Sequence, residues 1–173
     1  MTIHEQNARF EEWFAQHAAV LHHVANGFAD GTDRHDLMQE LLLAMWRAVP
    51  AFRQAAQPST FIFRVAHNAA LTWKRSRKNY RERVERFEHL AGRETHVPPA
   101  SDSRENETLQ LIYAQIRQFA PVDRSLILLH LDGVGYAEMA AIHGLTESNV
   151  GVRLNRLKHK LTHAMKGLAH ELR

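Results

Sequence analysis

The stretch Gly135 to Leu161, GYAEMAAIHGLTESNVGVRLNRLKHKL, predicts two short helices joined by a tight turn. The inner face of the first helix is marked by Ala137, Met139, Ala140 and Ile142. His143 and Gly144 form the turn, because glycine adopts a positive φ without steric cost. Thr146 stands where the second helix needs an N-cap. The spacing therefore predicts a helix-turn-helix.

The second helix of this motif, residues 147–163, has one apolar stripe and one basic face. The stripe consists of Val150, Leu154, Leu157 and Leu161. After Glu147 no acidic residue follows until Glu171, whereas arginines and lysines recur on the opposite face. A helix of this kind suits the major groove of DNA. The alternative is an ordinary helical hairpin with a solvated basic face.

The composition of the 173 residues limits the class of protein. A hydrophobic content of 45% is enough for a packed core, in one larger domain or two small ones. The net charge is only +3, so binding to a polyanion must depend on local clusters of basic residues. The absence of cysteine excludes disulfides and thiol catalysis and fits a reducing compartment. No signal peptide or membrane-length apolar run is present, so we expect a soluble, cytoplasmic chain without membrane insertion.

The fold class predicted from the whole chain is all-α, with two small helical domains joined by a flexible linker. Good helix formers dominate, and alternating β-type patterns are nearly absent. Helices are expected at about 2–28, at 34–49 with Asp33 as its cap, and from Ser59 or Thr60 to about residue 78 or beyond. Paired prolines and small polar residues predict the linker at 85–106. The domains are then 1–84 and 107–173, with further helices starting at Glu107 and at Pro121, whose inner residues include Leu126, Ile127, Leu129 and Leu131.

Each predicted domain carries one basic helix. The third helix ends in the sequence WKRSRKNYRER, residues 73–83, and the helix at 147–163 has the basic face described above. Two such helices on separate domains can contact two separated stretches of nucleic acid, and the linker sets the effective concentration of the second contact.

Metal-dependent or enzymatic chemistry finds no support in the sequence. His159 and His163 lie four residues apart on one helix, but no HExxH motif or Cys/His cluster accompanies them. A glycine-rich phosphate loop and a nucleophile elbow are also absent from the sequence. We expect no catalysis, no metal and no cofactor.

Three stretches together resemble the sigma factors of bacterial RNA polymerase, most closely the extracytoplasmic-function (ECF) group. Residues 33–52, DRHDLMQELLLAMWRAVPAF, resemble the region 2 signature, and residues 59–78, STFIFRVAHNAALTWKRSRK, are similar to the helix that follows it. Residues 121–161, including the helix-turn-helix, resemble region 4. The resemblance covers about Phe10 to Lys166. One departure is His35, where the family usually has a carboxylate, so an acidic docking patch is thinner here.

The resemblance implies that the second helix docks on core RNA polymerase. The family's partner is an arginine-rich coiled coil of the largest subunit, which carboxylates bind through charge-assisted hydrogen bonds. The implied polymerase-binding residues are Asp33, Asp36, Gln39 and Glu40. Alternatively, Asp36 only complements the helix dipole and Glu40 is a solvated surface charge.

The resemblance also implies that the first domain handles the −10 element of the promoter, where the family captures a flipped-out base. Gln54, Gln57 and Ser59 can supply hydrogen bonds, and Phe52 or Phe61 a stacking surface, unless both rings are core residues. Asn68 and Arg64 are implied contacts on the following helix. Phosphate binding is expected from Lys74, Arg75, Arg77 and Lys78, whose alternative is a solvated basic helix end.

Region 4 is implied to read the −35 element through its second helix. The base contacts are expected from Ser148, Asn149, Val152 and Arg153, which lie near the N-terminal end. Backbone contacts are expected from Arg156, Lys158 and Lys160, and from Arg124 unless that residue forms a structural ion pair.

The function implied is that of an ECF sigma factor. It binds core RNA polymerase and promoter DNA, directs transcription initiation, and is controlled by a separate anti-sigma factor. The principal alternative is a stand-alone helix-turn-helix regulator, which would have no use for the first domain. A protein that binds polymerase but not promoters is the other alternative, and the basic faces argue against it.

Overall fold

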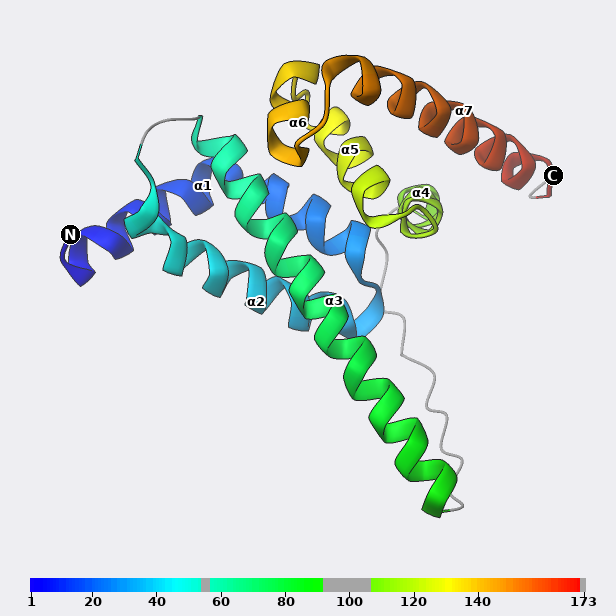
Figure 1. The fold of residues 1–173 in the computed structure, drawn as a ribbon, viewed down its shortest axis with the longest axis horizontal. Helices are drawn as coiled ribbons and strands as arrows, with labels where there is room; N and C mark the ends of the chain where they lie inside the picture. The colour runs from blue at the N-terminus through cyan, green and yellow to red at the C-terminus, as the bar shows by residue number, and fades with distance from the viewer. Residues whose placement is uncertain (54–56, 92–106, 172–173) are drawn as a thin grey trace.

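The protein is helical throughout the part that its computed structural model describes, which comprises residues 1–53, 57–91 and 107–171 (Figure 1). The first unit contains α1 (Ile3–Phe28), α2 (Gly31–Ala48), the short 3-10 helix η1 (Val49–Ala51) and α3 (Pro58–Ala91). The second unit contains α4 (Glu107–Arg117), α5 (Pro121–Leu131), α6 (Tyr136–His143) and α7 (Glu147–Glu171). These residues include no strand, so the predicted all-α class is confirmed.

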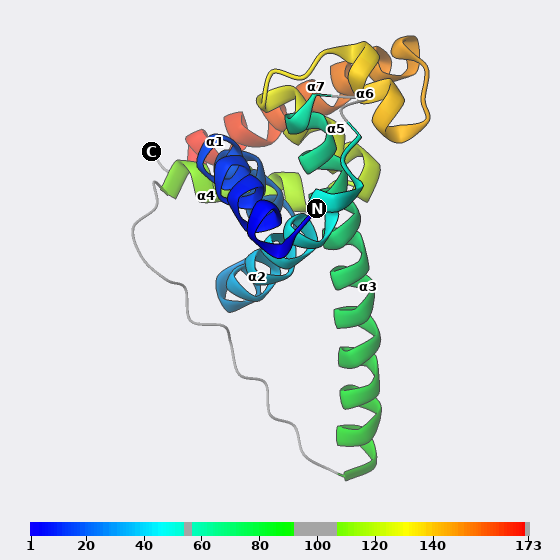
Figure 2. The ribbon, with the colours of Figure 1, turned by 90° about the vertical axis from the view of Figure 1, so that its left-hand side faces the viewer.

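The first unit is a bundle of α1, α2 and α3. Leucines and other large apolar side chains at helical spacing point inward, and the fully buried ones include Leu21, Leu37, Leu41, Met45, Ile62 and Phe63. A bend at His17, with φ −127° and ψ 17°, divides α1 into two segments. The C-terminal part of α3 projects from the packed helices (Figures 1 and 2).

The second unit contains the predicted helix-turn-helix. Gly144 ends α6 in the left-handed region, with φ 65°, and Thr146 Oγ1 accepts a hydrogen bond of 3.2 Å from the Asn149 backbone N–H at the start of α7. Met139, Val150 and Leu154 are fully buried against α5. The turn and the cap were therefore predicted correctly.

Several predicted element boundaries were wrong. Asp33 does not cap α2, because that helix begins earlier, at Gly31 after Asp30, and Asp33 lies in its first turn. Residues 85–91, assigned to the linker, belong to α3, because no glycine or proline interrupts the sequence between Ser59 and Ala91.

The inner faces of α5 and α6 also differ in detail from the prediction. Leu131 is 54% exposed at the last residue of α5, and Ala137 is exposed on α6. Leu128, which the pattern omitted, is fully buried, as are its neighbours 124–129. A helix that is buried around its whole circumference lies inside the protein and not at the surface.

Helix α5 is buried in this way because the two units pack on each other. Contacts join α1 to α4 and α5, and α3 to α5 and α6 (Figures 1 and 2). We call this contact the seam, and its central residues are Gly27, Phe28, His67, Arg124 and Leu128. Apolar residues on both sides belong to one continuous buried cluster.

No helix among the described residues has the length and hydrophobicity needed to cross a membrane.

Gly27 permits a close approach of α1 to α5 across the seam, and replacing it with a large residue is expected to separate the two units. A Cβ atom at this position would lie 2.6 Å from Leu128 Cδ1. One added methyl group could be absorbed by rotation of Leu128, so Gly27→Leu is the informative change, with an overpacking cost of about 1–3 kcal/mol. We expect an increased radius of gyration in small-angle X-ray scattering, with unchanged helical content.

The matched control is Ala19→Leu, at an exposed position of α1. An unchanged radius of gyration in Gly27→Leu would contradict the close contact between α1 and α5.

Candidate nucleic-acid and polymerase interfaces

The predicted base-reading end of α7 is open to solvent. Ser148, Asn149 and Val152 are exposed, and Val152 is 50% exposed although it is apolar. Val150 and Leu154, on the opposite face, are fully buried. Because the apolar stripe fixes the rotation of the helix, the polar N-terminal face points outward, as docking in a major groove requires.

Arg153 is held in place by two oxygen acceptors. Its Nη1 donates to Asp123 Oδ1 at 2.8 Å, and its Nε donates to Asn149 Oδ1 at 3.1 Å. Asp123 lies in the first turn of α5, so the contact joins two helices. Asn149 and Arg153 therefore form one hydrogen-bonded unit, which the sequence did not reveal.

The predicted backbone contacts of α7 follow on the same helix. Arg156, Lys158 and Lys160 are all exposed. Together they give this face a positive charge suited to phosphates.

On α3, the predicted contacts of the −10 element lie partly on an exposed face. Arg64 and Asn68 are exposed one helical turn apart, and Gln57 is exposed before them. Ser59 is half-buried, and Gln54 lies outside the described residues.

Asn68 also lines an open hollow of about 520 Å³ between α2 and α3. On its α2 side the hollow is lined by Glu40 and Arg47, and on its α3 side by Thr72 and Trp73. A predicted DNA contact and a predicted polymerase contact therefore line the same hollow.

The rings of Phe52 and Phe61 pack against Trp13. Both therefore fit the alternative of core residues better than that of a stacking surface for a base. Their centroids lie 5.1 Å and 5.8 Å from that of Trp13, and Trp13 is 3% exposed. Both phenylalanines are half-buried. Edge contacts of this kind fix the start of α3 beside α1.

The basic part of α3 is divided between exposed and engaged side chains. Lys74, Arg75 and Lys78 are exposed, and Lys78 Nζ lies 3.6 Å from Glu82 Oε1. Arg77 is half-buried and pairs with Asp33 of α2. Its guanidinium also lies 5.6 Å from the centre of the Trp73 ring. Arg77 is thus a link between helices in this structure.

The predicted polymerase-binding residues lie on α2, and Asp33 differs from the others. Asp36, Gln39 and Glu40 are exposed, whereas the Asp33 side chain is 14% exposed and bonded to Arg77. Asp36 Oδ2 is 3.9 Å from Arg77 Nη1. Asp33 and Arg77 pair with each other in this structure. Docking through Asp33 and phosphate binding through Arg77 would each require this pair to separate, and both stay predictions.

Arg124 is the largest departure from the predicted site. It is 2% exposed, and its Nη2 donates to the carbonyls of Arg117 at 2.7 Å and Phe119 at 3.0 Å. Its guanidinium lies 4.8 Å from the centre of the Phe28 ring. Arg124 is therefore not accessible to a phosphate in this arrangement. The alternative of a structural ion pair is not observed either, because the partners of Arg124 are two carbonyl groups and the Phe28 ring.

The seam encloses polar groups whose hydrogen bonding is incomplete. His67 is 5% exposed, and its ring meets the His143 ring edge-on at 5.2 Å between centroids. His143 Nε2 is 3.0 Å from Ser125 Oγ. Among the described residues, His67 Nδ1 and Arg124 Nε and Nη1 have no hydrogen-bond partner. Buried unpaired groups of this kind are costly, so the seam can be opened more easily than a fully apolar contact.

Burial also changes the acid–base properties of the seam. Burial, together with smaller contributions from the charges of His143 and Arg124, lowers the pKa of His67 to about 4. Burial lowers the pKa of His143 as well. His67 shares the buried face of α3 with Phe63 and Ala70, so its helical spacing was the available signal for its burial.

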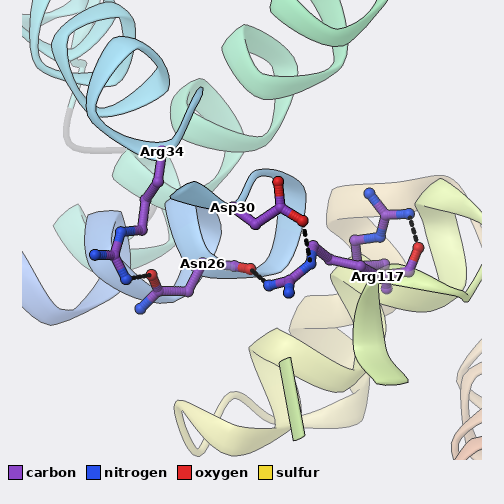
Figure 3. Close-up of polar contacts among 5 residues, drawn as sticks. Asn26, Asp30, Arg34 and Arg117 are labelled. Atoms are coloured by element: carbon purple, nitrogen blue, oxygen red, sulfur yellow. Dashed lines mark hydrogen bonds and ion pairs between the residues drawn. The ribbon is translucent and has the colours of Figure 1, made fainter. Parts of the chain in front are cut away.

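A second group of polar contacts lies at the edge of the seam and joins α4 to the junction of α1 and α2 (Figure 3). Arg117 donates to the Asn26 carbonyl at 2.9 Å and lies 3.7 Å from Asp30 Oδ2. Arg34 donates to Asn26 Oδ1 at 3.3 Å. Nothing in the sequence pattern indicated this group, because its members come from three separate helices and the loop.

His23 of α1 pairs with Asp132 after α5. This hydrogen bond raises the pKa of His23.

Two family models match the chain, in the order of its two units. Sigma-70 region 2 matches residues 13–80, and sigma-70 region 4 matches residues 109–161, which together are more than two thirds of the 173 residues. No curated protein matches the sequence.

Two solved structures have a similar fold. One is the sigma factor RpoE in complex with the anti-sigma factor NepR from Bartonella quintana, with a TM-score of 0.63 and 20% identity; the match covers 91% of this chain and 97% of RpoE. The other is CnrH in complex with the cytosolic domain of CnrY, with a TM-score of 0.62 and 21% identity; it covers 93% of this chain and 90% of CnrH.

The lowered pKa of His67 predicts that acid weakens the seam. A separated His67 has an ordinary pKa near 6.5, so the packed state binds fewer protons, and its stability is lost as the pH falls from 6.5 towards 4. At pH 5 we expect a loss of about 2 kcal/mol, seen as an increased radius of gyration relative to pH 7.5. His143 acts in the same direction, whereas the raised pKa of His23 means that its contribution is lost as the pH rises.

His67→Phe keeps a ring without a titratable nitrogen and should remain compact at pH 5. If this variant opens as readily as the unchanged protein, His67 is not the responsible group.

Proposed function

The chain belongs to the ECF group of the sigma-70 family of bacterial RNA polymerase sigma factors, and we propose how its two units divide the work of such a factor. It is an alternative sigma factor that directs promoter recognition and transcription initiation. The observation that carries this function is the presence of region 2 and region 4 in family order on one chain. A stand-alone regulator has no use for region 2, so nothing favours that alternative.

The first unit, which ends with α3 at Ala91, binds core polymerase and the −10 element in this proposal. The exposed side chains of Asp36, Gln39 and Glu40 support a docking face on α2. Carboxylates exposed on a rigid helix can accept charge-assisted hydrogen bonds from arginines of the polymerase. The factor acts through binding energy, without a catalytic residue, in the cytoplasm where polymerase and chromosome meet.

The −10 contacts are assigned to the exposed face of α3. Arg64 and Asn68 lie one turn apart on that face and Gln57 precedes them. Lys74, Arg75 and Lys78 extend the same helix with positive charge for phosphates.

The second unit, residues 107–173, reads the −35 element through α7. Exposure of Ser148, Asn149 and Val152 at its N-terminal end supports base contacts there. Arg124 joins the backbone contacts only when the seam opens, because the packed arrangement buries it. Promoter binding with all predicted contacts therefore involves separation of the two units.

Control by an anti-sigma factor is the partner interaction that we propose. RpoE is bound to an anti-sigma factor in its structure, and CnrH is bound to the cytosolic domain of CnrY. Both structures share the fold of this chain over nine tenths of its length. A separate inhibitor that covers both units would suit a chain whose polymerase and DNA faces are exposed.

Charge reversal on α2 tests the polymerase face. Asp36→Arg with Glu40→Arg should weaken binding to core polymerase by about 100-fold or more, since each of the two lost charge-assisted hydrogen bonds contributes about 1.5–3 kcal/mol. The measurement is competition with a labelled sigma factor for purified core enzyme. Glu11→Arg with Glu12→Arg, at exposed positions of α1, is the control of equal charge. Equal weakening by both pairs would mean that only net charge matters.

Salt dependence tests the phosphate contacts of α7. Lys158→Gln with Lys160→Gln should reduce the slope of log K against log salt by about 2, roughly one unit per lost contact. Affinity should fall equally for promoter and unrelated DNA, because phosphates carry no sequence information. An unchanged slope in fluorescence anisotropy titrations would remove both lysines from the interface.

A further inference from the structure

Asp123 places a carboxylate beside the predicted DNA-reading end of α7. Its Oδ1 accepts from Arg153 Nη1 at 2.8 Å, and Asn149 Oδ1 accepts from Arg153 Nε at 3.1 Å. The side chains of Arg153 and Asp123 are 39% and 28% exposed, so both are accessible to solvent. The region 4 surface thus contains an arginine whose direction is set from two sides.

The rigidity of both helices makes this direction well defined. Asp123 precedes a run of six buried residues in α5, 124–129, which fixes its backbone. Arg153 follows Val150 and precedes Leu154, which are both fully buried in α7. Asn149 is held at the helix start by the hydrogen bond from its backbone N–H to Thr146. The backbone positions of both acceptors are therefore fixed relative to Arg153.

Stability alone does not account for this carboxylate. Exposed ion pairs contribute little to folding, because both side chains lose entropy and solvent screens the charges. A negative charge beside a helix that approaches phosphates also opposes binding. Asp123 complements the dipole of α5 in its first turn, but that role requires no contact with Arg153.

We propose that Asp123 is a positioning residue for sequence recognition, which directs the free edge of the Arg153 guanidinium towards a base. This inference rests on the proposed function of α7 as the −35 reader. A guanidinium has five N–H groups, of which two are engaged here, so one on Nη1 and two on Nη2 remain. Two parallel donors match the O6 and N7 acceptors of guanine in the major groove. A guanine is therefore the base that this arrangement selects.

Removing the carboxylate has two effects of opposite sign. Without Asp123, Arg153 is free to turn to the nearest phosphate, so discrimination at one base pair is lost. The loss of a negative charge strengthens binding to DNA of any sequence. A purely structural residue would weaken all binding together, so this combination distinguishes positioning from folding.

The experiment uses the full chain with core polymerase and promoter DNA carrying a randomised −35 element. Relative occupancy of each sequence is read by sequencing bound DNA. We expect Asp123→Ala to lower the preference for guanine at one position about tenfold, with equal or greater binding to unrelated DNA. Asp123→Asn retains an oxygen acceptor and should keep more of the preference.

Glu138→Ala is the matched control, because Glu138 is the acidic residue in the first turn of α6. It removes the same charge from region 4 and should leave every base preference unchanged. Arg153→Ala should abolish the preference at the position that Asp123→Ala affects.

Unchanged preferences in Asp123→Ala, or an equal loss at every position, would overturn the positioning role. Failure of the proposed function gives a different result. If Arg153→Ala changes no preference while the wild-type protein still selects a −35 sequence, Arg153 is not a base contact and Asp123 has nothing to position. If the wild-type holoenzyme selects no sequence, region 4 is not the −35 reader and both proposals fail.

Discussion

The contact between Gly27 and Leu128 is the constraint on which the arrangement of the two units depends. A Cβ atom at position 27 would lie 2.6 Å from Leu128 Cδ1, so any residue larger than glycine requires Leu128 or the helices to move. Helix α5 is then enclosed by α1 and α3 on one side and by the rest of its own unit on the other. Its first turn carries two charged residues that serve different surfaces. Arg124 turns into the seam, whereas Asp123 turns to the arginine of α7. A single buried helix thus connects the packing of the units with the surface that we propose as the reader of DNA.

The seam combines buried apolar side chains with buried polar ones. Gly27, Phe28 and Leu128 at its centre are apolar, but Arg124 and His67 lie among them with incomplete hydrogen bonding. Such a contact is strong enough to order two small units and weak enough to open when a better partner competes. A sigma factor needs both properties, because its units must reach two separated promoter elements. In the proposed function, core polymerase and DNA supply the competing contacts, and part of their binding energy is used to open the seam.

Sequence periodicity was sufficient to predict the main helices and the helix-turn-helix, but it misplaced some helix ends and could not reveal the contacts between the units. Gly144, Thr146 and the stripe of Val150, Leu154 and Leu157 act locally, so the helix-turn-helix could be predicted from spacing alone. Arg124 could not, because its burial depends on Phe28, nearly a hundred residues away. The same applies to Arg77, whose partner Asp33 lies on another helix. The family resemblance predicted which faces meet polymerase and DNA, but a pairing such as Asp123 with Arg153 depends on how α5 and α7 cross. That crossing is set by the packed core.

Reconstituted transcription shows whether the chain acts as a sigma factor. Purified core RNA polymerase is supplied with genomic DNA, with and without this chain, and the start sites of the transcripts are sequenced. As an ECF sigma factor, the chain should produce discrete starts that share a two-part upstream motif and that are absent from the reaction with core enzyme alone. No new starts, together with binding of the chain alone to DNA, would contradict the account and identify a stand-alone regulator.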